Sequence, residues 1–256
     1  MKQKIKVENL SKSFNGVSVL TNVNLTIQDG ESLAVIGGSG CGKSVLIKCI
    51  AGLFQSDPGS SIMIDDFECS QLFVANRPDR IREKVGMLFQ SNALFDSMSV
   101  AENITFGLCN KISKTGFLDA SQRNFLNKTA KENLEVVGLS ENNLEKYPYE
   151  LSGGMQKRVA IARLITTKPE IILLDEPTTG LDPVTSYNIS QLILEVKKMT
   201  NATVVTITHD PICVGELADR IALIDNKTVA WIGLQNELDT ARSPYIDAFK
   251  RATKSS

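Results

Sequence analysis

The chain is short of several features that define whole classes of protein. Its 256 residues include one tryptophan, one histidine and five cysteines, and its 28 basic and 29 acidic side chains nearly cancel. The cysteines are odd in number and lack metal-ligand spacing, so we expect reduced thiols in a cytoplasmic protein rather than a disulfide framework or a zinc site. Because no basic block stands out, nucleic acid is not expected as a main partner.

Long apolar runs are missing as well. The N-terminal sequence MKQKIKVENL has no apolar stretch of the kind found in signal peptides, and nothing approaches the ~18 consecutive apolar residues of a membrane-spanning helix. We therefore expect the chain itself to stay outside the bilayer. Its length suffices for one large α/β domain with a smaller lobe, and such a domain buries enough core to fold without disulfides.

The first part of the chain predicts a sheet followed by a phosphate loop. Apolar and polar positions alternate over residues 4–36, and the turns Asn15-Gly16 and Asp29-Gly30 interrupt them, which predicts an antiparallel sheet. Residues 32–36 form a short buried strand that runs into glycines, and residues 43–53 carry apolar side chains at helical spacing. Strand, loop and helix thus follow in the order that a phosphate loop needs.

The rest of the chain predicts a helical lobe and a parallel sheet. Residues 99–149 lose the strand signals and gain helical patterns, whereas short β-branched runs alternate with helical stretches after residue 171. We expect a single α/β domain over residues 1–256. Its parts are expected at 1–98 and 150–240 for a nucleotide-binding core with an antiparallel β subdomain, 99–149 for a helical subdomain, and 241–256 for a docked helical tail.

Residues 37–44, Gly-Gly-Ser-Gly-Cys-Gly-Lys-Ser, fit the pattern G-x-x-x-x-G-K-S of a phosphate loop. Glycines allow backbone N–H groups to surround a β-phosphate, and the lysine reaches the β and γ oxygens. The serine hydroxyl that follows can ligate Mg²⁺. The sequence therefore predicts that ATP is bound by Gly37, Gly38, Ser39, Gly40, Cys41, Gly42, Lys43 and Ser44, and that Ser44 also holds the metal ion.

Two adjacent carboxylates follow the apolar run of residues 171–174. Asp175 and Glu176 are expected at the carboxyl edge of the sheet, beside the phosphate loop, because ligands of open α/β sheets bind there. Asp175 is placed to hold Mg²⁺ through water, and Glu176 to deprotonate the water that attacks the γ-phosphate. Asp-Glu-Pro alone is more typical of a strand-ending turn, but Lys43 upstream favours the catalytic interpretation.

Two further strands end in side chains suited to the same edge. His209 follows the strand of residues 203–208 and would keep Glu176 and the attacking water in register, so the expected catalytic residues are Lys43, Glu176 and His209. Gln90 follows an apolar strand and offers a neutral oxygen that can ligate Mg²⁺ and sense the γ-phosphate. A lone histidine after a strand is more often a capping or core residue, and this glutamine would be unremarkable by itself.

A second glycine-rich turn, Leu151-Ser152-Gly153-Gly154-Met155, opens a helix shortly before the carboxylate pair. Backbone N–H groups at a helix N-terminus bind anions, so the chain is predicted to carry two phosphate-binding surfaces in one domain. This combination excludes a plain P-loop kinase or GTPase.

Over nearly its whole length the chain resembles the nucleotide-binding subunit of ABC transporters. In that family residues 37–44 are the Walker A loop, Gln90 the Q-loop, residues 151–155 the signature, residues 171–176 the Walker B strand and His209 the switch histidine. The motifs fall in the family's order. The resemblance implies a RecA-like P-loop NTPase core with an antiparallel β subdomain and a helical subdomain that extends into the signature helix.

The resemblance also implies how ATP and Mg²⁺ are held. The protein would form a head-to-tail homodimer in which each ATP lies between the Lys43 loop of one subunit and Ser152, Gly153 and Gly154 of the other. Phe14 would stack on adenine, where the family more usually has tyrosine. A strand-end aromatic packed in the core is an equally good interpretation of that phenylalanine.

Two stretches point to one branch of the family. Residues 87–96, MLFQSNALFD, and Met155 at the end of the signature look like the Mla/MCE lipid-transport ATPases, and residues 244–249 are similar to their C-terminal ends. Departures are Asn92, where glycine is commoner, and a longer helical insert around residues 111–127. This resemblance implies transport of phospholipid between envelope membranes.

The partners follow from the same resemblance. They would be integral membrane permease subunits, an MCE-type substrate-binding protein and a small regulatory subunit, with the ATPase bound peripherally at the cytoplasmic face of the inner membrane. Two alternatives stay open: the ATPase of a small-solute importer for amino acids or metals, and a soluble ABC ATPase of an assembly system. DNA-repair and translation-factor relatives are disfavoured because they need coiled-coil insertions or tandem ATPase domains.

Overall fold

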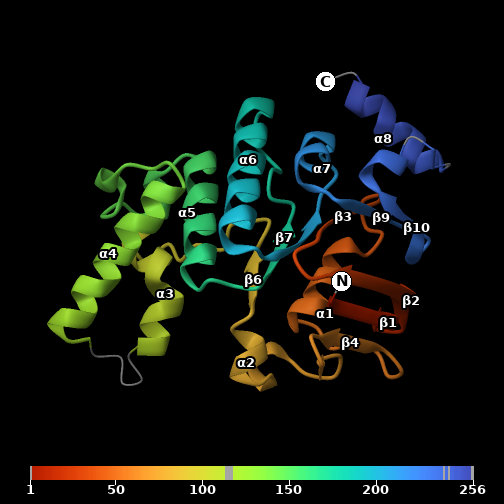
Figure 1. The fold of residues 1–256 in the computed structure, drawn as a ribbon, viewed down its shortest axis with the longest axis horizontal. Coiled ribbons are helices and arrows are strands. Elements are labelled where there is room, and N and C mark those ends of the chain that lie inside the picture. Colours follow the sequence, from red (N-terminus) through yellow and green to blue (C-terminus); the bar gives the residue numbers. More distant parts are fainter. Residues whose placement is uncertain (1, 113–117, 239, 242, 255–256) are drawn as a thin grey trace.

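The computed structural model describes residues 2–112, 118–238, 240–241 and 243–254. Part of the expected helical insert, residues 113–117, lies outside this range, as do Ser255 and Ser256 of the tail. The described residues form two sheets and the helices that cover them, which confirms the predicted α/β class (Figure 1). No helix among the described residues is long and apolar enough to cross a membrane.

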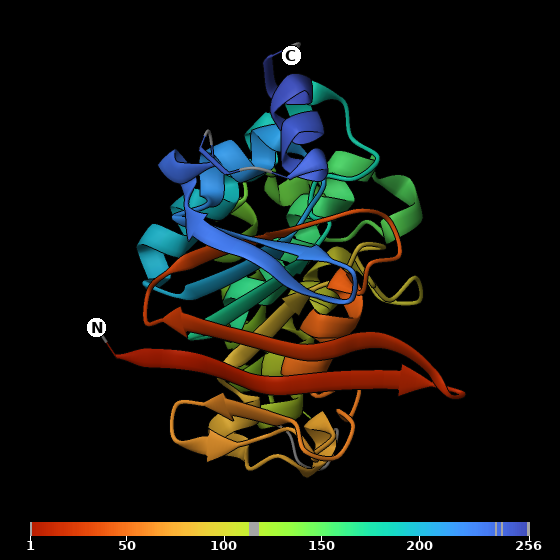
Figure 2. The ribbon, with the colours of Figure 1, turned by 90° about the vertical axis from the view of Figure 1, so that its right-hand side faces the viewer.

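The first sheet is antiparallel and has the strand order β2-β1-β4-β5. Its long hairpin turns at Asn15-Gly16, where both residues have positive φ, as a two-residue turn between twisted strands requires. Figure 2 shows this hairpin in red, with the orange β4 and β5 beside it. The sequence did not predict β4 and β5, which are too short to show a periodic pattern. The strands are β1 (Gln3–Phe14), β2 (Val17–Gln28), β4 (Ser61–Ile64) and β5 (Phe67–Glu68).

The second sheet has the order β10-β9-β3-β8-β7-β6 and is parallel except for β10. Every residue of β3, β7 and β8 is buried, so these strands are mostly continuous apolar runs and do not alternate between apolar and polar residues. The expected antiparallel sheet over residues 4–36 was therefore too long, because it ends at β2 and β3 joins this second sheet. Its strands are β3 (Ser32–Ile36), β6 (Val85–Leu88), β7 (Ile171–Asp175), β8 (Thr203–Ile207), β9 (Arg220–Asp225) and β10 (Thr228–Leu234).

Helix α1 packs between the two sheets, and its apolar residues share one buried cluster with side chains of both. The helix ends two residues earlier than its apolar spacing predicted. Gly52 caps it in the left-handed conformation with φ +78°, and a Cβ there would lie 2.6 Å from the guanidinium carbon of Arg77. That buried arginine donates from Nη1 to the carbonyl of Ile50, 2.7 Å away, and so satisfies a free carbonyl at the helix C-terminus.

The remaining helices cover the core sheet and extend it at one end. Helices α5 and α6 share a buried cluster with β6, β7 and β8, and α3 and α4 pack against α5. At the other end α8 packs against α7, β3 and β9. The helices are α1 (Lys43–Ala51), α2 (Asp79–Arg82), α3 (Val100–Ile112), α4 (Ala120–Val136), α5 (Gly153–Thr166), α6 (Pro183–Thr200), α7 (Pro211–Leu217) and α8 (Pro244–Lys254), with 3₁₀ turns at Val74–Asn76, Glu141–Asn143, Pro148–Glu150 and Gln235–Glu237.

A cluster of ion pairs ties the two sheets together at the amino ends of β6 and β7. Lys4 of β1 is 5% exposed and its Nζ lies 3.1 Å from a carboxylate oxygen of Asp65, in the turn between β4 and β5. Lys84, just before β6, pairs with the same aspartate, and both lysines reach Glu170. Burial by itself raises the pKa of Asp65, but hydrogen bonds and charges from Lys84 and Lys4 outweigh it and hold that pKa below its ordinary value.

Replacing Asp65 should therefore make the protein less stable in a pH-dependent way. A carboxylate with a lowered folded-state pKa stabilises fully above its unfolded pKa, and this contribution is lost as the pH falls through the folded pKa. We expect Asp65→Asn to lower the free energy of unfolding by about 2 kcal/mol at pH 7 and to differ little from the parent near pH 2. Asparagine tolerates the positive φ of this position.

Urea unfolding at both pH values measures the difference. The matched control is Asp66→Asn, the exposed neighbour in the same turn, which should behave as the parent throughout. A stability loss of equal size at pH 7 and pH 2 would contradict the role of the Asp65 charge.

Candidate active site

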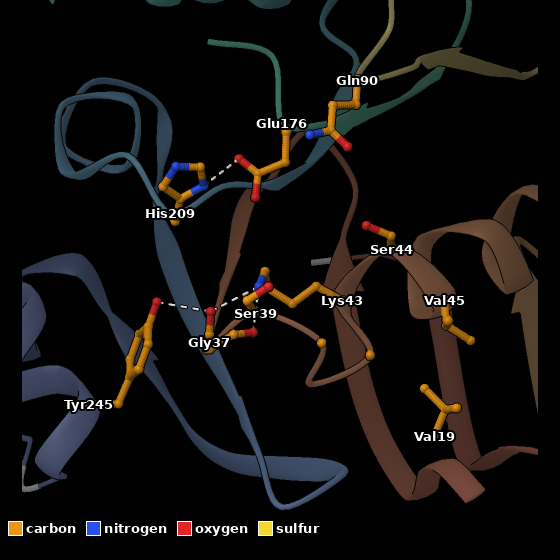
Figure 3. Close-up of a pocket in the computed structure, with 13 residues that line it drawn as sticks. Val19, Gly37, Ser39, Lys43, Ser44, Val45, Gln90, Glu176, His209 and Tyr245 are labelled. Carbon is orange, nitrogen blue, oxygen red and sulfur yellow. Dashed lines mark hydrogen bonds and ion pairs between the residues drawn. The ribbon is translucent and has the colours of Figure 1, made fainter. Parts of the chain in front are cut away.

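An open cavity lies where the parallel strands of the core sheet end. Its volume is about 640 Å³, and it gathers segments that are far apart in the sequence: the loops after β3, β6, β7 and β8, and helix α8. The carboxyl ends of parallel strands meet at one edge, so their loops converge there. The described residues that line the cavity, shown in Figure 3, are Val19, Gly37, Gly38, Ser39, Gly40, Gly42, Lys43, Ser44, Val45, Gln90, Glu176, His209 and Tyr245.

The phosphate loop follows β3 and opens α1. Gly42, the N-cap of α1, has φ +106°, and a Cβ there would lie 2.6 Å from the Leu20 side chain of the neighbouring hairpin. Only glycine fits that backbone and that space. Lys43 is 8% exposed, and its Nζ donates to the carbonyls of Gly37 (2.8 Å) and Gly38 (2.9 Å). The ammonium is therefore held inside the loop that is expected to bind phosphate.

Three oxygen-bearing side chains were predicted to hold Mg²⁺. The Ser44 hydroxyl donates to a carboxylate oxygen of Asp175 at 2.9 Å, and Asp175, the last residue of β7, is 3% exposed. Gln90, just after β6, faces the same cavity. Hydroxyl, amide and carboxylate oxygens are the hard ligands that Mg²⁺ prefers, so the residues present fit this ion.

Glu176 lies at the centre of a small network above the loop. Its φ is +53°, in the left-handed region that costs a non-glycine residue about 1 kcal/mol. The strain is held by a hydrogen bond from the Glu176 N–H to the carbonyl of Ile207, at the end of β8. One carboxylate oxygen accepts from Thr179 Oγ1 at 2.9 Å and lies 2.8 Å from His209 Nδ1. The carboxylate is thus aimed into the cavity by its neighbours (Figure 3).

His209 is neither a core nor a capping residue in the structure. Its side chain is 62% exposed, on the loop between β8 and α7, whereas Glu176 is 12% exposed. Because the His209 side chain is exposed, it can move toward or away from the largely buried Glu176 carboxylate without disturbing the core. The neighbouring Asp210, which caps α7, accepts from Thr178 Oγ1 at 2.8 Å and links the loops after β7 and β8.

The predicted signature residues lie elsewhere in the chain. Ser152 caps α5 by accepting from the Met155 N–H at 3.3 Å, and both Ser152 and Gly153 are exposed. Neither they nor Gly154 line the Lys43 cavity. Phe14 also lies outside that lining, is 38% exposed, and packs edge-on against Phe54 with ring centroids 5.3 Å apart. One chain therefore does not bring the two predicted phosphate-binding surfaces together.

Comparison with known proteins gives the family. Residues 20–179 match the family model described as "ABC transporter". The chain is 37% identical over 236 residues to the methionine import ATP-binding protein MetN of Clostridium tetani, covering 91% of this chain and 70% of that protein. It is 36% identical over 247 residues to the "Probable ribonucleotide transport ATP-binding protein mkl" of Mycobacterium tuberculosis, covering 96% and 66%.

The chain belongs to the ABC transporter family. Its fold matches the ATP-binding cassette MJ0796 in a dimeric post-hydrolysis state bound to ADP and Pi, with a TM-score of 0.77 and 31% identity over 90% of this chain and 98% of that one. The protein is therefore an ATP-binding ABC ATPase, as its motifs predicted.

The loop after β6, which carries Gln90, is fixed to α5 by two cations that the sequence analysis missed. Lys157 on α5 is 2% exposed and donates to the carbonyl of Gln90 at 3.2 Å. Arg163, two turns further along α5, donates to the carbonyls of Asn92 (2.9 Å) and Ala93 (2.7 Å). Asn92 and Ala93 both have positive φ, a conformation that asparagine tolerates better than most residues do.

Replacing Lys157 should therefore raise the thermal stability of the protein but lower its ATPase activity. Burial lowers the pKa of Lys157 to about 8, so its charged form is held at a cost at pH 7. We expect Lys157→Met to raise Tm by about 2 °C or more, because an apolar chain of similar length removes that cost. The same change should lower ATPase kcat about threefold or more, since the Gln90 carbonyl loses its donor.

Calorimetry and a steady-state ATPase assay measure the two effects. Lys198→Met, at an exposed position of α6, is the control and should leave both values unchanged. Parent-like ATPase activity in Lys157→Met would show that the contact does not support the Q-loop.

Proposed function

We propose that this chain is the ATP-hydrolysing subunit of an Mla/MCE-type lipid transporter, acting with Mg²⁺ as a homodimer on membrane permease subunits. The observation that carries the ATPase mechanism is the placement of Glu176 between Thr179 and His209, over the Lys43 loop. The lipid assignment rests on the resemblance of residues 87–96, Met155 and residues 244–249 to that branch. The homodimer and the permease subunits are supported by membership of the ABC transporter family and by the dimeric structural relative.

Within one chain each group has a separate task. Lys43 exchanges the carbonyls of its own loop for the β and γ oxygens of ATP, so binding costs little desolvation of an already buried ammonium. Ser44, Asp175 and Gln90 would hold Mg²⁺, which neutralises charge on the phosphates. Glu176 takes a proton from the attacking water, and His209 Nδ1 keeps the carboxylate oriented.

A second copy of the chain completes the site. Ser152 and Gly153 are exposed and Gly154 is half-buried at the amino end of α5, where N–H groups and the helix dipole favour a γ-phosphate. They do not line the cavity of their own chain, so a partner's ATP is the ligand that they fit. The dimeric state of the structural relative MJ0796 supports a dimer.

A groove in the helical subdomain is suited to the permease. It lies between α3 and α4, is lined mainly by apolar side chains such as Ala101, Phe106 and Leu126, and carries Glu102 and Arg123. Its neighbour α5 is tied to the Q-loop through Lys157, so movement at Gln90 is passed to the helical subdomain. By the resemblance to the Mla/MCE branch, the ATPase would be bound peripherally at the cytoplasmic face of the inner membrane.

One rival within transport has direct support. The relatives named for methionine, ribonucleotide and sulfate transport are 36–38% identical to this chain, so a small-solute importer is the second candidate. Affinity capture of the tagged chain from native membranes in mild detergent, with mass spectrometry of bound protein and lipid, decides between them. A permease with an MCE-type partner and phospholipid supports the proposal, whereas a solute-importer permease, or soluble assembly proteins alone, overturns the lipid assignment.

Glu176→Gln tests the catalytic base. Glutamine keeps the size of the side chain but cannot accept the proton of water, so kcat should fall by about 100-fold or more while ATP still binds. Steady-state hydrolysis and equilibrium binding of labelled ATP measure the two quantities. Glu195→Gln, on the exposed face of α6, should hydrolyse ATP as the parent does. Unchanged turnover in Glu176→Gln would remove the proposed role.

A further inference from the structure

The C-terminal helix contributes one side chain to the nucleotide cavity. Tyr245, in the first turn of α8, lines the cavity together with the phosphate loop, more than two hundred residues earlier in the sequence. Its hydroxyl donates to the carbonyl of Gly37 at 2.9 Å (Figure 3). The predicted nucleotide-binding motifs do not include this tyrosine, and the contact forms because α8 packs against β3.

The carbonyl of Gly37 receives hydrogen bonds from two different helices. It accepts from Tyr245 Oη and, at 2.8 Å, from Lys43 Nζ, which fills both of its lone pairs. Gly37 is buried, and a Cβ at this position would lie 2.4 Å from the carbonyl oxygen of Ile224 on β9. The first residue of the phosphate loop is thus confined between the end of β9 and the tyrosine hydroxyl.

The helix that carries the tyrosine is firmly docked. Ile246 and Phe249 are buried in a cluster with Ala34 and Ile36 of β3, so α8 rests on the strand that leads directly into the loop. Burial, the main influence, raises the pKa of Tyr245, which keeps its hydroxyl protonated and able to donate at neutral pH. The donor therefore has a fixed position and a fixed protonation state.

We propose that Tyr245 is a positioning residue of the ATP site, through which the docking of α8 sets the affinity for ATP. This inference rests on the proposed role of the Lys43 loop in binding ATP. When Lys43 turns to the phosphates, the buried Gly37 carbonyl keeps one donor only because Tyr245 is present. Without that hydroxyl the carbonyl competes with ATP for the ammonium, since an unpaired buried acceptor is unfavourable.

The test compares Tyr245→Phe with the parent chain. Phenylalanine keeps the ring that stacks with Phe249 but loses the hydroxyl donor. We therefore expect an unchanged Tm and an ATP affinity about fivefold weaker. The KM for ATP should rise by the same factor, with kcat nearly unchanged. Labelled ATP measures affinity in chains that also carry Glu176→Gln. Tyr187→Phe, an exposed tyrosine on α6, is the control for removal of a phenol and should bind as the parent does.

A second measurement tests whether the effect of Tyr245→Phe is confined to the phosphate loop. Hydrogen exchange of the amides of residues 38–44 should be faster in nucleotide-free Tyr245→Phe, whereas exchange in the core strands should match the parent. Parent-like ATP affinity and loop exchange in this variant would overturn the inference. A different variant, Lys43→Ala, tests the proposed function. It should abolish ATP binding if the phosphate loop is the ATP site. ATP binding by Lys43→Ala would overturn the proposed function, whatever the result for Tyr245→Phe.

Discussion

Four parallel strands of the core, β3, β6, β7 and β8, end at one edge of the sheet, and each is followed by a group expected to touch ATP. The phosphate loop follows β3, Gln90 follows β6, Glu176 follows β7 and His209 follows β8. Backbone hydrogen bonds between neighbouring strands fix their register, and so fix how far each strand extends toward this edge. The geometry of the site is therefore set by the register of the sheet, and the side chains only complete it.

Holding groups at this edge requires backbone conformations that the chain does not adopt freely. Glu176, Asn92 and Ala93 all have positive φ, and each is held by contacts from another element. The Glu176 N–H binds the end of β8, and Lys157 and Arg163 donate to the carbonyls of the bend that contains Asn92. Strained residues persist only where the surrounding structure holds them in place, and here that structure is the core sheet and α5.

Local patterns in the sequence were enough to predict the fold class. The strand, loop and helix around Lys43 span only residues 32–51, and the buried strand before Glu176 spans residues 171–175, so their apolar patterns and glycines can be recognised in the sequence. The two shortest strands of the antiparallel sheet were missed because four and two residues show no pattern. The end of that sheet was placed too late, since only pairing shows that β3 belongs to its parallel neighbours.

The supports of the site could not be predicted for a related reason. Tyr245 and Lys157 contact residues far away in sequence, Gly37 and Gln90, so local patterns do not reveal these two contacts. A lysine on the buried face of an amphipathic helix was the one available signal for Lys157. The expected adenine contact of Phe14 stays a prediction, because its ring packs on Phe54 outside the cavity lining.

Each ATP site is proposed to be shared between two chains, and complementation between two defective chains tests this sharing. One chain carries Lys43→Ala and the other Ser152→Ala with Gly154→Asp; each homodimer should be inactive. In the heterodimer, purified through two different tags, one site keeps an intact Lys43 and an intact signature, so about half of the parent ATPase rate should return. No recovery in a correctly assembled heterodimer would contradict the shared site.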